Sequence, residues 1–141
     1  MARKTRKQSD SDRKYWVAFS RVRGIGAVRH NALISRFGTL AEAWRATRTE
    51  LKEAGLEEST VRSIVNGRAD IDPDAEMERL EKAGVRAITL DDAEYPALLK
   101  STDDAPAVLF ARGEFSPADG LSIAVVGTRR PTPYGRQVAE E

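Results

Sequence analysis

The stretch IAVVGTRRPTPYG, residues 123–135, combines an apolar run, a glycine and two adjacent arginines. A strand that is apolar nearly throughout is typical of a sheet covered by helices on both faces, so LSIAVVG at 121–127 predicts a buried strand of an α/β domain. TPYGRQVAEE at 132–141 would begin the covering helix. Ligands of such sheets collect beyond the carboxyl ends of the strands, where a helix N-terminus can face an anion. The candidate phosphate-binding residues are Gly127, Thr128, Arg129 and Arg130.

Two arginines supply planar, paired donors that stay charged at physiological pH, which suits phosphate. The common nucleotide motifs are absent from this stretch: the next glycine after Gly127 is Gly135, which excludes G-x-G-x-x-G, and no GK[ST] follows. The alternative is a glycine that merely ends a strand, with arginines that pair with carboxylates. The spacing alone leaves both interpretations open.

RGIG, residues 23–26, is a second glycine signal, placed between two stretches with the apolar period of amphipathic helices. Such a turn exposes the first N–H groups of the second helix, which can hold a phosphate, and it is similar to the hairpin of helix-hairpin-helix DNA-binding modules. Arg21 lies beside it, and the candidate secondary DNA contacts are Arg23, Gly24, Gly26 and Arg29. The alternative is a tight corner between helices with solvated arginines.

Periodicity and capping residues predict about five short helices before residue 68, at 13–22, 27–38, 40–46, 50–55 and 59–67. Gly38 is the expected C-terminal cap of the second, and Thr39 and Thr49 are the expected N-caps of the third and fourth, with Glu53 near capping-box spacing. A proline-started helix at 70–84, strands at 85–90 and 107–113, and a turn-rich connection between them follow.

Composition bounds the classes of protein that fit. The chain has 141 residues, 40% of them hydrophobic, which is enough for a core. It has no cysteine, which excludes disulfides and thiolate metal sites, and its single histidine, His30, would leave a zinc site to rest mainly on carboxylates. We therefore expect no metal, and no cofactor is expected either. The apolar stretches are too short to cross a bilayer, and the basic start lacks the apolar core of a signal peptide, which indicates a cytoplasmic protein without membrane contact.

The net charge of +1 hides an asymmetry. Residues 1–50 carry 12 basic and 4 acidic side chains, a net charge of +8, whereas residues 51–120 carry 8 and 16, a net charge of −8. A basic segment beside an acidic one indicates that the basic segment binds polyanions. Residues 1–12 are expected to be a disordered basic tail, and removing them still leaves the first block at +6.

Other candidates are weaker. Aromatic side chains could stack on bases, but at helical spacing they favour the core; these are Trp16, Phe19, Phe37 and Trp44. Paired carboxylates could serve acid–base chemistry, but they fall in turns where aspartate is expected anyway; these are Asp91, Asp92, Asp103 and Asp104.

The two stretches YPALLKSTDDAPAVLFARG at 95–113 and IAVVGTRRPTPYG at 123–135 resemble the DNA-processing family DprA, also called Smf. That family reads as YP, two leucines, a proline before V-L-F-x-x-G, then a strand into G-[ST]-R and a YG pair. GIGAVRHNALISRFGTLAEAW at 24–44 also fits its N-terminal helical domain, which is similar to helix-hairpin-helix and SAM-like folds. The resemblance covers nearly all of residues 13–141.

The resemblance implies a protein of natural transformation and recombination that is not an enzyme. It implies single-stranded DNA binding in a basic pocket of an extended Rossmann-like domain, a homodimer, and help in loading the recombinase RecA. The phosphate-contacting G-[ST]-R falls on Gly127, Thr128 and Arg129, with Arg130 beside it, and the YG pair on Tyr134 and Gly135. The family's domain continues well past residue 141, so the other pocket walls and the dimer surface are expected to be missing here.

The expected organisation is thus α/β, with a tail at 1–12, a helical helix-hairpin-helix or SAM-like domain at 13–68, and the truncated start of a Rossmann-like domain at 69–141. Two other hypotheses stay open. A Rossmann-like nucleotide phosphoribohydrolase of the lysine-decarboxylase-like group would need a PGGxGT loop beyond residue 141. Alternatively, the helical domain is a protein-interaction module that binds no DNA.

Overall fold

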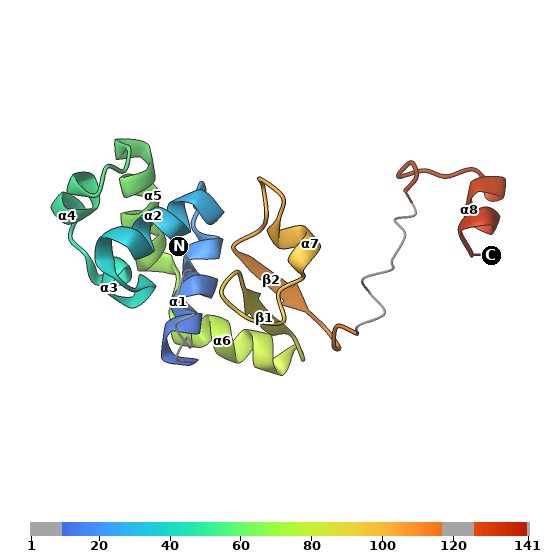
Figure 1. Cartoon of the computed structure of the whole chain (residues 1–141), viewed down its shortest axis with the longest axis horizontal. Coiled ribbons are helices and arrows are strands. Elements are labelled where there is room, and N and C mark those ends of the chain that lie inside the picture. Colours follow the sequence, from blue (N-terminus) through green and yellow to red (C-terminus); the bar gives the residue numbers. More distant parts are fainter. Residues whose placement is uncertain (1–9, 117–125, 141) are drawn as a thin grey trace.

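The computed structural model describes residues 10–116 and 126–140. These residues are mostly helical and include one small two-stranded sheet (Figure 1). In chain order the elements are α1 (Asp10–Arg21), α2 (Ala27–Phe37), α3 (Leu40–Arg45), α4 (Arg48–Glu53), α5 (Glu58–Asp70), α6 (Pro73–Lys82), β1 (Arg86–Thr89), α7 (Ala97–Lys100), β2 (Val108–Ala111) and α8 (Pro133–Glu140).

The five helices predicted before residue 68 are present, and two of their predicted caps are confirmed. Gly38 adopts a φ of 82° and its N–H donates to Ile34 O at 2.8 Å, which ends α2. The Thr39 hydroxyl accepts the N–H of Glu42 and so begins α3. α1 begins at Asp10 rather than at residue 13.

The predicted cap of α4 is wrong. Thr47, not Thr49, is the N-cap: its hydroxyl accepts the N–H of Glu50, whose carboxylate accepts the N–H of Thr47 at 2.7 Å. The sequence spacing explains why Thr47 is the cap, because a capping box needs a carboxylate or amide three residues after the hydroxyl. Three residues after Thr49 stands Lys52, an ammonium that has no acceptor to offer.

α1 is the centre of the hydrophobic core. Trp16 and Phe19 are fully buried, which confirms the core interpretation of these aromatics, and Trp44 packs edge-on against Phe19 with ring centroids 4.9 Å apart. One side of α1 contacts α3, and other contacts reach α6, β1 and β2. One continuous buried cluster therefore extends across residue 68, and the division into domains there stays a prediction.

β1 and β2 pair antiparallel, with Arg86 opposite Ala111 and Thr89 opposite Val108. The connection between them is pinned by Tyr95, whose buried hydroxyl donates to Pro106 O at 2.7 Å. Burial raises the pKa of this phenol, so it stays a donor at neutral pH. The strand predicted at 121–127 falls largely on residues 121–125, which lie outside the described residues.

A charged contact joins α1 to the sheet. The Arg13 guanidinium donates to both carboxylate oxygens of Asp92, at 2.6 and 3.0 Å, and to Ala87 O at 2.8 Å. The same carboxylate accepts the N–H of Thr89 at 2.7 Å. Burial alone would raise the pKa of Asp92, but the hydrogen bonds from Arg13 and Thr89 outweigh it and hold the pKa below its ordinary value. Asp92 is thus a structural residue, not a free carboxylate.

We expect Asp92→Asn to lower the free energy of unfolding by about 2–3 kcal/mol at pH 7, because the partly buried Arg13 guanidinium then loses its paired contact with the Asp92 carboxylate. A depressed folded-state pKa contributes stability above the pKa of the unfolded chain, and this contribution is lost as pH falls through the folded-state pKa. The Asp92→Asn variant should therefore lose less stability than the parent on acidification. Urea unfolding at pH 7 and in acid measures both effects.

Asp91→Asn is the matched control, because this neighbouring carboxylate is exposed. We expect it to change the free energy of unfolding by less than about 0.5 kcal/mol. Equal losses for Asp91→Asn and Asp92→Asn would contradict the role given to the Arg13 contact.

Candidate nucleic-acid interface

The predicted phosphate loop leads directly into a helix. Residues 126–132 have no regular structure, and α8 begins at Pro133. The Thr132 hydroxyl accepts the N–H of Gly135 at 3.1 Å, which caps the helix. No atom would lie within 4 Å of a Cβ at Gly127, so a ligand can approach the backbone there. The YG pair therefore forms the first turn of the helix that follows the loop.

The two arginines of this loop are uncommitted. Arg129 and Arg130 are exposed, and within residues 10–116 and 126–140 neither forms a hydrogen bond or an ion pair. All residues from 126 to 140 are exposed, and Figure 1 shows α8 outside the body that α1 to α7 form with the sheet. Two free guanidinium groups before a helix N-terminus can bind phosphate oxygens in pairs.

The hairpin between α1 and α2 has the expected backbone. Gly24 has a φ of 85°, which side chains other than glycine rarely adopt, and the buried Ile25 fixes the turn to the core. Gly26 is the N-cap of α2 in an extended conformation, with no side chain to accept the first N–H groups. The first turn of α2 also lacks an acidic residue, so no carboxylate of that turn offsets the positive end of the helix.

The arginines around this hairpin are less available than the sequence indicates. Arg29 donates to Gly24 O at 2.6 Å and so holds the turn itself. Arg21 lies 3.5 Å from the buried carboxylate of Glu76 on α6. Of the three, Arg23 alone is exposed without a described hydrogen bond or ion pair. The hairpin therefore offers one uncommitted cation, whereas the loop before α8 offers two.

The sequence analysis considered His30 only as a metal ligand, yet this residue supports the hairpin. Its ring is fully buried, stacks on Trp16 with centroids 5.3 Å apart, and meets Phe19 edge-on. Nδ1 lies 3.1 Å from Gly26 O and must carry the proton, since a carbonyl only accepts. Burial lowers the pKa of His30, so the ring adds no positive charge at neutral pH. Its role is to hold the hairpin against the core.

The paired aspartates that the sequence analysis named as weaker candidates do not share one environment in the structure. Asp91, Asp103 and Asp104 are exposed, while Asp92 is bound to Arg13. Within the described ranges, no three carboxylate or imidazole side chains converge as a metal site would require. None of the helices in those ranges has the length and apolar character needed to cross a bilayer.

Comparison with known proteins identifies relatives. Residues 86–141 match the family model of DNA recombination-mediator protein A. The chain is 30% identical over 132 residues to Protein Smf of Synechocystis sp., an alignment that covers 90% of this chain and 33% of that protein. It is 48% identical over 56 residues to the DNA processing protein DprA of Bacillus subtilis, which covers 39% of this chain and 19% of that protein.

The chain thus spans about a third or less of the length of these curated relatives. No solved structure matches it significantly.

The hairpin geometry predicts opposite effects for its two glycines. Gly24→Ala should cost about 1–2 kcal/mol of stability, because alanine is strained at positive φ. Gly26→Ser should cost nothing and add up to about 1 kcal/mol, because serine fits the extended backbone and can cap α2. Thermal or urea unfolding of the two variants checks this. Equal destabilisation by both would show that the hairpin has a different backbone.

Proposed function

The chain belongs to the DprA (Smf) family of DNA-processing proteins, and from this we propose that it forms part of a single-stranded DNA-binding protein of natural transformation and recombination. In this proposal the protein acts in the cytoplasm as a DNA-binding mediator that helps to load a RecA-type recombinase, not as an enzyme. The observation that carries it is the pair of uncommitted arginines, Arg129 and Arg130, inside the segment that matches the family model.

The proposed contact is with the phosphate backbone. Gly127 lets a strand approach the main chain, and Thr128 adds a hydroxyl donor beside the two guanidinium groups. Contacts of this kind position a strand without reading its sequence. We therefore expect binding to any single strand, with an affinity that falls as salt rises.

The same proposal gives a role to the other segments of the chain. Residues 13–68 would be the helix-hairpin-helix or SAM-like domain, and residues 69–141 the start of a Rossmann-like domain whose further walls complete the pocket. Arg23 and the N–H groups behind Gly26 would be a secondary DNA contact, weaker because Arg21 and Arg29 already have partners. The homodimer would form through parts of the family's domain that follow residue 141.

Arg129→Ala should weaken the binding of a labelled single-stranded oligonucleotide, equally for different base sequences. Loss of one phosphate contact should also reduce the slope of log affinity against log salt by about 0.7. Because the chain carries one wall of the proposed pocket, its overall dissociation constant should be about 10⁻⁴ M or weaker. Fluorescence anisotropy at two salt concentrations measures both quantities.

The matched control is Arg62→Ala, which removes an exposed arginine of α5 without a described partner. Arg23→Ala tests the hairpin in the same assay. If Arg62→Ala lowers affinity and salt slope as much as Arg129→Ala, binding is a general effect of charge and the loop is not a site. If Arg23→Ala has the larger effect, the hairpin is the primary contact.

A further inference from the structure

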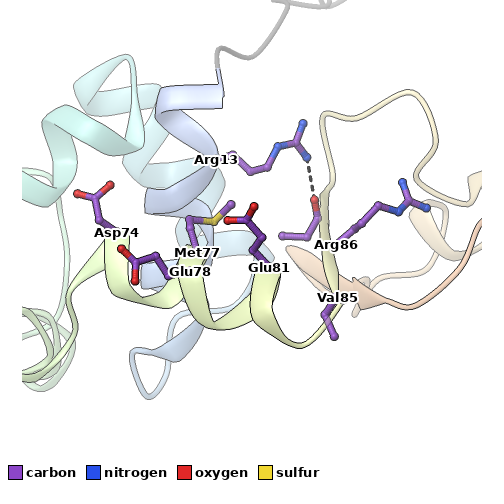
Figure 2. A pocket seen from close by; sticks show the side chains of 9 residues that line it. Arg13, Asp74, Met77, Glu78, Glu81, Val85 and Arg86 are labelled. Carbon is purple, nitrogen blue, oxygen red and sulfur yellow. Dashed lines mark hydrogen bonds between the residues drawn. The ribbon is translucent and has the colours of Figure 1, made fainter.

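An open groove of about 730 Å³ lies between α1, α6 and β1, on a part of the molecule that the proposed DNA contacts do not use. Figure 2 shows Asp74, Glu78 and Glu81 along α6, below Arg13 of α1. Met77, Val85 and Ala87 add apolar surface. The groove thus combines apolar surface with a row of carboxylates.

Three carboxylates and two arginines line the groove, and once their partners are counted one negative charge is left, at Glu81. Arg13 is engaged by Asp92 and Ala87 O, and Arg86 by Glu94 and Gly113 O, so both guanidinium groups already have acceptors. Among the carboxylates, Asp74 is bound by Lys14, and Glu78 lies 3.4 Å from Lys82. Glu81 is exposed, and its carboxylate has no hydrogen bond or ion pair within the described residues.

We propose that this groove docks the chain's own basic N-terminal segment, MARKTRKQS, residues 1–9. The segment carries Arg3, Lys4, Arg6 and Lys7 and no acidic residue. Long basic side chains suit such a groove, because their methylene stems can cover apolar surface while their charged ends meet carboxylates. Lys14, one turn into α1, already donates a hydrogen bond to Asp74 of the groove at 2.8 Å.

The connection to α1 brings the segment within reach. Nine extended residues span up to about 30 Å, whereas the distance along α6 from Asp74 to Glu81 is about 10 Å at the rise of an α-helix. Exposed ion pairs are individually weak, so a free peptide of this sequence would bind poorly. A short tether raises the effective concentration to the millimolar range, which lets weak contacts act together.

The absence of cysteine allows a direct test in the whole chain. Ala2→Cys carries a nitroxide label, and paramagnetic broadening of backbone amide signals shows which residues the segment approaches. We expect broadening at Met77, Glu81 and Val85 and none at Leu51 or Val61 on α4 and α5. Salt near 1 M should remove it, because the Debye length falls to about 3 Å.

Two charge-reversal variants, one in the groove and one outside it, provide the test and its control. Glu81→Lys should abolish the broadening, whereas Glu53→Lys, an equal change at an exposed glutamate of α4, should leave it intact. Retained broadening in the Glu81→Lys variant, or uniform broadening over the surface, would overturn the proposal. So would broadening that appears only when a spin-labelled chain is mixed with a separate isotope-labelled chain, because the occupant would then be a second copy.

Discussion

The paired hydrogen bonds between Arg13 and Asp92 tie the first helix to a turn 79 residues further along the chain. The Arg13 side chain is 24% exposed and that of Asp92 is 15% exposed, so the pair is shielded from water without being fully desolvated. Arg13 also bonds Ala87 O, and Asp92 also accepts from Thr89, so one contact fixes both the end of β1 and the turn that follows it. The buried face of α1, with Trp16 and Phe19, is thereby held between the other helices and the sheet.

The arginines of the described residues fall into two groups: some stabilise the fold through hydrogen bonds, and others are exposed and can bind a ligand. Arg13, Arg29 and Arg68 donate to backbone carbonyls. Arg68 binds the carbonyls at the end of α3, and burial lowers its pKa. The arginines at 129 and 130 have no such task within the described residues. The proposed DNA contact therefore rests on side chains that the described fold does not use.

Local signals predicted much of the fold. The apolar period located the helices, and Gly38 and Thr39 marked two of their ends because capping depends on near neighbours. Thr47 was also within reach of such reasoning, since Glu50 stands at the required spacing. Contacts between residues far apart in the sequence could not be predicted in this way. Nothing near Arg13 in the sequence indicates Asp92 as its partner, and the contact of Arg21 with Glu76 depends on how α6 packs. Arg21 therefore has a partner on α6 that the sequence around the hairpin does not indicate.

We propose that phosphate is held by the loop before α8 more than by the hairpin before α2. Amide chemical-shift changes on titration with a short single-stranded oligonucleotide test it directly, because both segments are observed in one experiment. We expect the largest changes at residues 127–130 and smaller ones at residues 23–29. Changes confined to residues 23–29, with residues 127–130 unaffected, would contradict it.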